Sequence, residues 1–209
     1  CGHIEHIFGA DGGKKMAAEY GMDYLGAQSN SLAFCLSVEK LLGMDVPQRV
    51  KDIRVLIAEL QRLSSHLVWF GTHGMEIGAI TVMLYTFRER EILMNLNEMM
   101  AGFRFFPSYI RVGGLRDDLP RGFKEAVAEF VGRLPGKLDE YETMLTKNPI
   151  WLDRTRGVGT ITLADCYQYG LFGPVARAAG GDYDVRRAFP YSGYETYQFD
   201  VIGASNGDV

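Results

Sequence analysis

Cysteine is scarce in this 209-residue chain: its three copies, Cys1, Cys35 and Cys166, are scattered and form no Cys-x-x-Cys pair. So small a set cannot build a disulfide framework, which suits a reducing compartment. Nickel and iron-sulfur clusters need several thiolates that converge on one point, so we expect the chain to hold neither. Cys35 falls on an apolar helical face and is expected to be a core residue.

The sequence also lacks long hydrophobic runs. Apolar stretches such as residues 77–85 are broken by Glu or Arg well before the ~18 residues that a membrane span needs. The first residues show no signal-peptide pattern. We therefore expect the protein to be exposed to the cytoplasm, and to rest on other proteins if it works at a membrane.

No charge of one sign dominates either. The formal net charge is −4, the isoelectric point is near 5.6, and basic residues are interleaved with acids. This pattern predicts no basic surface patch for nucleic acid, so nucleic-acid binding is disfavoured. The chain is 47% hydrophobic and 23% charged, as expected for a globular protein with one substantial core.

Hydrophobic periodicity predicts four main helices, over residues 28–43, 49–72, 80–103 and 120–146. Gly43 should end the first helix. Asp117 or Asp118 should cap the fourth, which Pro135 should kink. The fold class is therefore predicted to be mainly α, with a helical-bundle core.

After residue 148 the composition changes: glycine residues separate short segments, and aromatic residues lie between them. This composition predicts a loop-rich carboxy-terminal part with short helices. Thr162 and Asp165 have the spacing of a capping box at the start of a short helix, residues 162–169.

Tyr24 is the residue that most clearly suggests a chemistry. It stands just ahead of a helix that begins in a polar cluster, Gln-Ser-Asn-Ser at residues 28–31. A phenol with a pKa of about 10 stays protonated at neutral pH and can donate a hydrogen bond to a carbonyl oxygen that gains negative charge. The alternative is a buried tyrosine whose hydroxyl satisfies a backbone carbonyl.

Charged residues on the predicted helices are expected at surfaces. Helical spacing relates Glu59, Arg62 and Arg54, as on a helical ion-pair face. The alternative for these charges is an interface with partner proteins. The Arg-Glu-Arg-Glu run at residues 88–91 is interpreted as a solvated or partner-facing surface. His66 and His73, seven residues apart, are expected to be core or interface histidines rather than metal ligands.

The amino terminus offers two weak motifs. The Gly-Gly-Lys-Lys run at residues 12–15 lacks the Gly-x-x-x-x-Gly-Lys-Ser/Thr spacing of a phosphate loop. Cys1, His3, Glu5 and His6 could share one face of an extended chain and meet a metal ion, but a lone half-site at a terminus rarely binds one. We predict no metal site.

A series of short motifs follows the chain from residue 22 onward. In order along the chain, they are Met22-Asp23-Tyr24-Leu25, Leu41-Leu42-Gly43, Ile53-Arg54-Val55, Ala58-Glu59-Leu60, Ser65-His66-Leu67, Ile77-Gly78-Ala79, Arg88-Glu89-Arg90-Glu91, Tyr109-Ile110-Arg111-Val112-Gly113-Gly114, Asp118-Leu119-Pro120, Pro190-Tyr191-Ser192-Gly193-Tyr194 and Phe199-Asp200-Val201. Each motif alone is weak, but together, in their order and spacing, they resemble the middle of the D subunit of respiratory complex I, the NADH:quinone oxidoreductase. The resemblance implies a helical core similar to the large subunit of nickel-iron hydrogenases.

Residues 1–21 do not fit that resemblance and form a predicted foreign segment ahead of the complex I-like domain, residues 22–209. Cys1-Gly2-His3, the glycine-lysine run and Tyr20-Gly21 resemble the carboxy-terminal stretch of ParA-like iron-sulfur carrier ATPases. We place the seam between Gly21 and Gly26. The complex I-like domain is expected to be truncated at both ends.

The resemblance implies a role in quinone reduction. Tyr24 matches the family's tyrosine that contacts the quinone headgroup. Glu76 stands where the family often has an aspartate that partners a histidine, and a carboxylate hydrogen-bonded to imidazole raises its basicity. That histidine lies in a hairpin that this sequence lacks. The alternative for Glu76 is a helix-terminal acid exposed to solvent.

The resemblance also implies cofactors and partners. Electrons would reach the quinone from an iron-sulfur cluster held by a neighbouring protein of the complex, and NAD(H) would be used by the complex without binding to this chain. The partners would be other complex I proteins, especially the cluster-bearing B subunit, the C subunit and the membrane protein of the quinone channel. The expected location is peripheral, on the cytoplasmic side of the inner membrane, and the expected activity of the complex includes proton translocation.

Two other functions stay open. The chain could be an inactive structural or assembly fragment that exposes apolar surface meant for its partners. A nickel-iron hydrogenase large subunit is disfavoured, because paired cysteines are missing.

Overall fold

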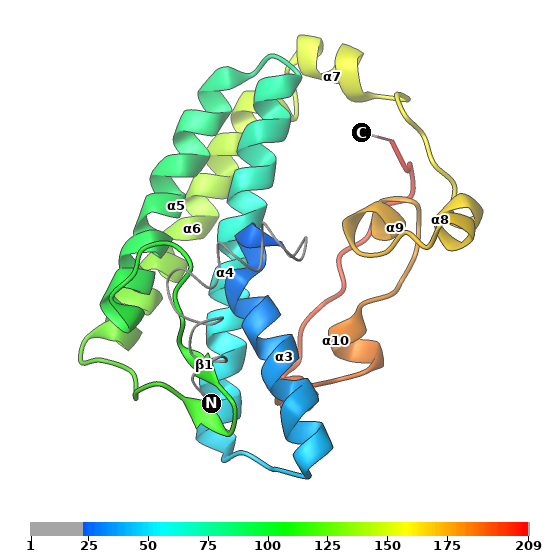
Figure 1. Ribbon diagram of the computed structural model, residues 1–209. Coiled ribbons are helices and arrows are strands. Elements are labelled where there is room, and N and C mark those ends of the chain that lie inside the picture. Colours follow the sequence, from blue (N-terminus) through cyan, green and yellow to red (C-terminus); the bar gives the residue numbers. More distant parts are fainter. Residues whose placement is uncertain (1–22, 209) are drawn as a thin grey trace. The chain divides into compact units, whose positions relative to one another are not determined.

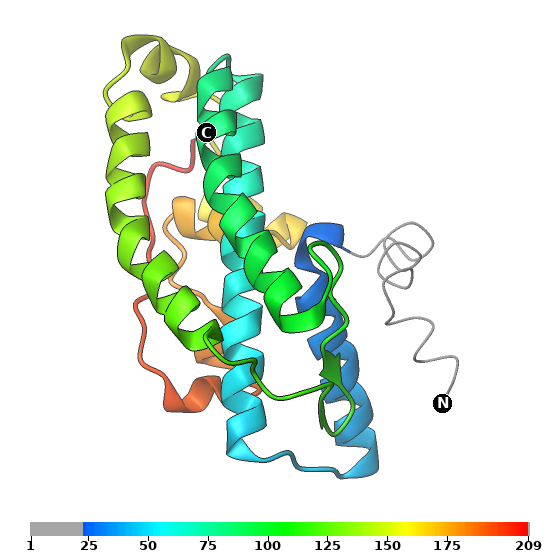
Figure 2. The same ribbon diagram turned by 90° about the vertical axis from the view of Figure 1, so that its left-hand side faces the viewer.

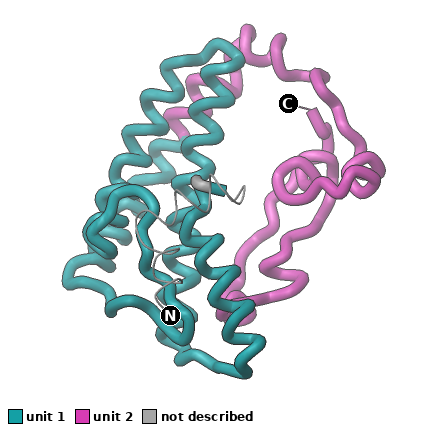
Figure 3. The backbone as a smooth tube through the Cα atoms, viewed as in Figure 1, with its two compact units in different colours: residues 1–138 teal, residues 139–209 magenta. Residues whose placement is uncertain are grey.

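The computed structural model describes residues 23–208, which divide into two compact units on either side of Leu138 (Figure 3). The predicted foreign segment at residues 1–21, with the candidate half-site of Cys1, His3, Glu5 and His6, lies outside the described residues. The described part is mainly helical, as predicted. None of its helices combines the length with the hydropathy that a bilayer crossing requires.

The first unit is built on long helices (Figures 1 and 2). A short 3₁₀ turn, η1, leads into α3, and a two-stranded antiparallel hairpin separates the last two helices. In chain order the elements are η1 (Tyr24–Gly26), α3 (Ala27–Leu42), α4 (Gln48–Glu76), α5 (Ile80–Ala101), β1 (Ile110–Arg111), β2 (Gly114–Leu115) and α6 (Phe123–Leu145), whose last turns belong to the second unit.

Two of the predicted helix ends need correction. Gly43 ends α3 in the left-handed conformation, with φ of 64°, as predicted. α4 runs one turn beyond its predicted end and reaches Glu76. α6 begins at Phe123, and Asp118 does not cap it. Asp118 pairs instead with Arg49 at 2.7 Å. Pro135 lies inside the continuous α6 helix.

α4 and α5 form a closely packed antiparallel hairpin (Figure 1). Gly71 and Gly74 let the helices approach: a Cβ atom at Gly71 would lie 3.1 Å from the backbone Cα of Met83 and would meet the Thr86 hydroxyl. The turn between the helices passes through Gly78, with φ of 106°. The core of this unit lies between its helices and includes Leu32, Cys35, Ile53, Ile57, Leu60, Leu67, Val82, Leu93, Leu96, Phe123 and Phe130.

Glu89 corrects the prediction of a solvated surface at residues 88–91. Its side chain has no solvent-exposed area. The carboxylate accepts hydrogen bonds from Arg88 Nε at 2.8 Å and from Arg133 Nη2 at 2.9 Å. Glu89 thereby joins α5 to α6, because a buried carboxylate needs such charged donors to offset its desolvation.

The second unit contains short helices joined by glycine-rich loops, as predicted. Its elements are α7 (Pro149–Thr155), α8 (Leu163–Tyr169), α9 (Pro174–Ala178), α10 (Val185–Ala188) and η2 (Tyr194–Thr196). The capping box at α8 is confirmed: the Thr162 hydroxyl accepts from the Asp165 backbone N–H, and Asp165 accepts from the Thr162 backbone N–H. Cys166 is buried in this helix.

Candidate functional site

Tyr24 is the first residue of η1, the turn that leads into α3. The preceding Asp23 caps this turn, because its Oδ1 atom accepts a hydrogen bond from the Leu25 backbone N–H at 2.9 Å. Asn30, one turn into α3, donates from Nδ2 to the Asp23 carbonyl at 2.7 Å. These bonds fix the backbone around Tyr24, whose side chain lies outside the described part of the structure.

η1 is attached to the middle of α4. Gln61 Nε2 donates a hydrogen bond to the carbonyl oxygen of Leu25. The predicted position of Tyr24, on a short connection ahead of a helix, is thus confirmed for the backbone. Sequence reasoning did not identify Gln61, because its partner is a backbone atom 36 residues away.

Polar side chains gather where α3 begins, in what we call the entrance cluster: Gln28, Ser31, Gln61 and Ser64. Gln28, Ser31 and Ser64 are buried, and Gln61 is half-buried. α3 and α4 run antiparallel (Figure 1). An ion pair between Glu39 and Arg54 joins the two helices and marks a common level. From that level, Gln28 and Ser64 both lie roughly 15 Å along their own helices, at a rise of 1.5 Å per residue. The cluster is therefore at one level of the helix pair, next to η1.

Gln28 is the unusual member of the entrance cluster. Its side chain has no exposed area, and neither its amide nitrogen nor its amide oxygen has a hydrogen-bond partner among the described residues. A buried polar group without a partner costs about 1–3 kcal/mol. Groups of this kind in native proteins require an explanation, such as a ligand or a role in catalysis.

A buried ion pair holds α3 against α4 below the entrance cluster. Arg54 donates from Nη1 and Nη2 to the two carboxylate oxygens of Glu39, at 2.9 and 2.6 Å. Arg54 is completely buried and Glu39 is nearly so. The prediction that Arg54 belongs to an ion-pair face along its own helix is wrong, because its carboxylate partner lies on α3. The pairing of Arg62 with Glu59 on the same helix, at 3.1 Å and about one-third exposed, does fit that prediction.

The same ion pair also holds the β1–β2 hairpin. Arg54 Nη2 donates to the carbonyls of Arg111 and Gly114, at 2.8 and 3.1 Å, and the Gly113 backbone N–H donates to Glu39 at 2.7 Å. Burial by itself would raise the pKa of Glu39, but the hydrogen bonds from Arg54 and Gly113 outweigh it and lower that pKa below its usual value. The carboxylate therefore stays ionised, and one charged pair fixes three elements.

Glu76 is the last residue of α4 and is exposed. It lies fifteen residues beyond Gln61, or about 22 Å along the helix axis. The backbone of Tyr24 and the residue Glu76 thus lie at different levels along α4.

His73 is a neighbour of Glu76 that the sequence predicted to be a core or interface histidine. It precedes Glu76 by three residues, a spacing at which helical side chains meet. Its ring stacks on Trp69, with centroids 5.2 Å apart and an interplanar angle of 15°. His66, by contrast, is exposed rather than part of the core. Within residues 23–208, no group of three or more His, Cys, Asp or Glu side chains is arranged to hold a metal ion.

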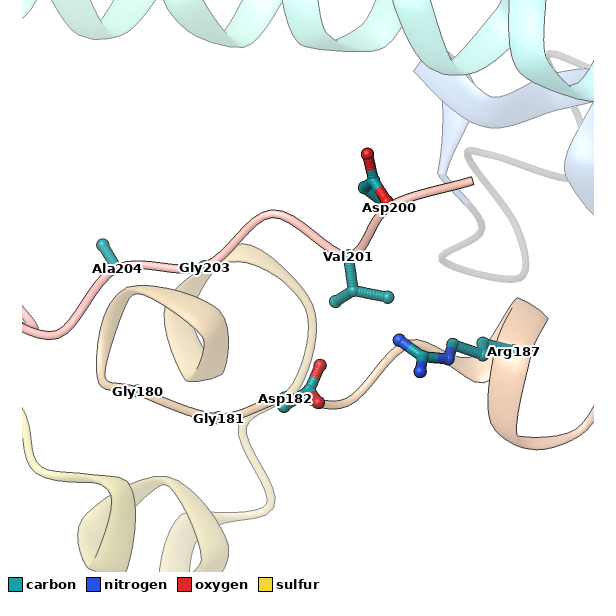
Figure 4. Close-up of a pocket in the computed structure, with 8 residues that line it drawn as sticks. All are labelled: Gly180, Gly181, Asp182, Arg187, Asp200, Val201, Gly203 and Ala204. Carbon is teal, nitrogen blue, oxygen red and sulfur yellow. The ribbon is translucent and has the colours of Figure 1, made fainter. Parts of the chain in front are cut away.

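The second unit has an open pocket of about 520 Å³ (Figure 4). Its lining includes the glycines Gly180, Gly181 and Gly203 and three charged residues, Asp182, Arg187 and Asp200. Binding sites for apolar ligands are lined mainly by hydrophobic and aromatic side chains. Val201 is the largest apolar side chain in this lining, so the pocket does not suit a lipid-like substrate.

Beside this pocket, a buried carboxylate orders the loop that follows α9. Asp184 accepts hydrogen bonds from Arg186 Nε and Nη2, at 3.0 and 2.7 Å, and these bonds lower the pKa of Asp184 to about 2. The Arg186 guanidinium lies 4.7 Å from the ring centroid of Phe199. This cluster is structural, because both charges are already paired and the arginine is packed against an aromatic ring.

Comparisons with known proteins agree on one family. The family model described as "Respiratory-chain NADH dehydrogenase, 49 Kd subunit" matches residues 76–209. The D subunit of the NADH-quinone oxidoreductase from Citrifermentans bemidjiense is 53% identical over 188 residues, which are 90% of this chain and 48% of that protein. The D subunit numbered 2 from Chloroflexus aurantiacus is 50% identical over 188 residues, 90% of this chain and 46% of that protein.

The chain thus spans about half the length of the curated relatives that it matches. Each of the two alignments covers nine-tenths of this chain, and in each of them at least half of the aligned residues are identical. The chain belongs to the family of the respiratory-chain NADH dehydrogenase 49 Kd subunit, whose bacterial members are named as the D subunit of NADH-quinone oxidoreductase.

Proposed function

We propose that the chain forms part of the quinone-reduction site of an NADH-quinone oxidoreductase. The observation that carries this proposal is the place of Tyr24: it begins a turn whose backbone is held by Asp23, Asn30 and Gln61, beside a cluster of buried polar side chains. A fixed backbone with nearby hydrogen-bonding groups suits recognition of a headgroup carbonyl.

The chemistry requires two electrons and two protons to convert a quinone to a quinol. Tyr24 would donate a hydrogen bond, and then a proton, to a headgroup oxygen as negative charge develops on it. Glu76 would raise the basicity of an imidazole that supplies the second hydrogen bond, from a part of the family's fold outside this chain. The electrons would come from an iron-sulfur cluster in a neighbouring protein of the complex, and NAD(H) would bind elsewhere in the complex.

The remaining details belong to the same proposal. The partners would be the cluster-bearing B subunit, the C subunit and the membrane protein of the quinone channel. The chain would be peripheral to the inner membrane on its cytoplasmic side, and the complex would couple electron transfer to proton translocation. Its helical core would be similar to that of the nickel-iron hydrogenase large subunit, and residues 22–209 would form the complex I-like domain after a foreign segment at 1–21.

The test is Tyr24→Phe in the assembled complex. We expect quinone reduction to fall about 100-fold, because the phenol supplies both a hydrogen bond and a proton. NADH oxidation by an artificial acceptor should stay unchanged, since it does not use the quinone site. Tyr169→Phe, at an exposed position of α8, is the matched control. Unchanged quinone kinetics in Tyr24→Phe would contradict the assignment.

A second function is favoured by exposed apolar side chains. Trp69 of α4 and Ile80 and Leu84 of α5 are each more than half exposed. Exposed apolar residues of this size mark surfaces for other proteins when they form a patch. As an alternative, the chain would be a structural or assembly piece without activity of its own. The purified chain should then self-associate and bind no quinone analogue, whereas a monomer that binds one would exclude this alternative.

A further inference from the structure

Gln28 is a buried polar residue whose position is not explained by protein packing alone. It lies in the first turn of α3, which directly follows η1, the turn that begins at Tyr24. Its carboxamide is completely buried, and both of its polar atoms lack hydrogen-bond partners among the described residues. Ser31, the other buried polar residue of the same helix start, donates to the Ala27 carbonyl at 3.1 Å and so is satisfied within α3.

We propose that Gln28 is a second hydrogen-bonding residue for the quinone headgroup, alongside Tyr24. This inference rests on the proposed function. A carboxamide has N–H donors as well as an acceptor oxygen. Its Nε2 can therefore donate to a quinone carbonyl, and its Oε1 can accept from a quinol hydroxyl, without any change in its own protonation. The three rotatable bonds of the side chain let the carboxamide turn toward η1.

The unpaired state of Gln28 is what distinguishes a ligand-binding role from a structural one. An amide that served the fold would have its partner within the protein, as Gln61 has in the Leu25 carbonyl of η1. Replacing an unpaired buried amide by an apolar side chain of similar length removes a desolvation cost, so it should not weaken the fold. Removing an amide that binds a ligand should weaken binding of that ligand.

The experiment compares Gln28→Met with wild type in the assembled oxidoreductase, using a short-chain quinone as the substrate. We expect the KM for the quinone to rise about three- to tenfold, as for the loss of one hydrogen bond. The midpoint of thermal unfolding should not fall, and NADH oxidation by an artificial acceptor should be unchanged. Ser29→Ala, an exposed position in the same turn of α3, is the control for disturbance of the helix start.

An unchanged KM in Gln28→Met would overturn the inference. A raised KM together with a lowered unfolding midpoint would overturn it as well, because the amide would then serve the fold. If Gln28→Met does not assemble, Gln28→Asn decides, because it keeps the amide but withdraws it by one methylene. Its KM should rise about threefold, and an unchanged KM would again overturn the proposal. Tyr24→Phe is measured in parallel. If it impairs quinone reduction while Gln28→Met does not, only this inference fails; if neither variant has an effect, the proposed function fails as well.

Discussion

At the scale of single residues, the buried ion pair of Arg54 and Glu39 is the most consequential interaction of the first unit. It joins two helices and a hairpin through hydrogen bonds between 2.6 and 3.1 Å long. A buried ion pair adds little net stability compared with an apolar pair, but the loss of one partner leaves an uncompensated charge. The pair therefore specifies how the elements fit together more than it stabilises them.

Arg54→Met should lower the free energy of unfolding by about 3–5 kcal/mol, because Glu39 would be left buried without its cation. Urea unfolding followed by circular dichroism measures this change. Arg62→Met is the matched control on the same helix: its pair with Glu59 is about one-third exposed, so the loss should be under about 1 kcal/mol. Equal losses in the two variants would contradict the central role of the buried pair.

Asp184 makes the stability of the second unit depend on pH in the acidic range. Hydrogen bonds from Arg186 lower its pKa from 3.8 to about 2 in the folded chain. Because the folded pKa is depressed, the stabilisation is fully present above about pH 4 and is lost as the pH falls through about 2. It amounts to about 2 kcal/mol, since each pKa unit corresponds to about 1.4 kcal/mol.

The measurement compares the wild-type chain with Asp184→Asn, using the fluorescence of Trp151 in a Trp69→Phe background to follow the second unit. The difference in unfolding free energy should be largest near pH 6 and should shrink as the pH approaches 2. Asp182→Asn, at an exposed carboxylate of the neighbouring pocket, should differ little from wild type at any pH. A difference for Asp184→Asn that is independent of pH would be inconsistent with the depressed pKa.

At the scale of elements, the α4–α5 hairpin depends on two glycines that sequence patterns alone do not explain. Glycine inside a helix costs about 1 kcal/mol relative to alanine, so a helix does not favour it. At Gly71 the reason is space: a Cβ atom would lie 3.1 Å from the Met83 backbone and would meet Thr86. The close approach of the two backbones is therefore a property of the packed pair.

Gly71→Ala should lower the free energy of unfolding by about 1–3 kcal/mol, because the helices must move apart to admit the methyl group. Gly132→Ala in α6 is the matched control, since that position is exposed and has no atom within 4 Å of the added Cβ. The control should be stabilised by about 0.5–1 kcal/mol through helix propensity. Opposite signs in the two variants, measured by urea unfolding, would confirm that packing sets the need for glycine at residue 71.

Helix positions in this chain were largely predictable. The end of α3 at Gly43 and the capping box of α8 follow from local hydrogen-bonding rules, and both are confirmed. The start of α6 was not predicted, because Asp118 has an alternative partner, Arg49, at a separation of 69 residues. Local signals fail where a distant residue competes for the same side chain.

At the scale of the whole molecule, the two compact units carry different kinds of site. Tyr24, Gln28, the entrance cluster and Glu76 all belong to residues 23–138, whereas the polar pocket belongs to residues 139–209. The proposed quinone chemistry therefore concerns the helical unit. Because the chain spans about half the length of its relatives, the proposed activity must be tested in the assembled complex.

The sequence by itself determined the family, the mainly helical class, the order of the main helices and the position of Tyr24 ahead of α3. These follow from periodicity, caps and motif spacing, which depend on neighbouring residues. Only the tertiary structure decided that Arg54 and Glu89 are buried, that Gln61 holds η1 and that Gln28 is left without a partner among the described residues. Burial of a charge or an amide depends on which distant groups can satisfy it, and no local pattern contains that information.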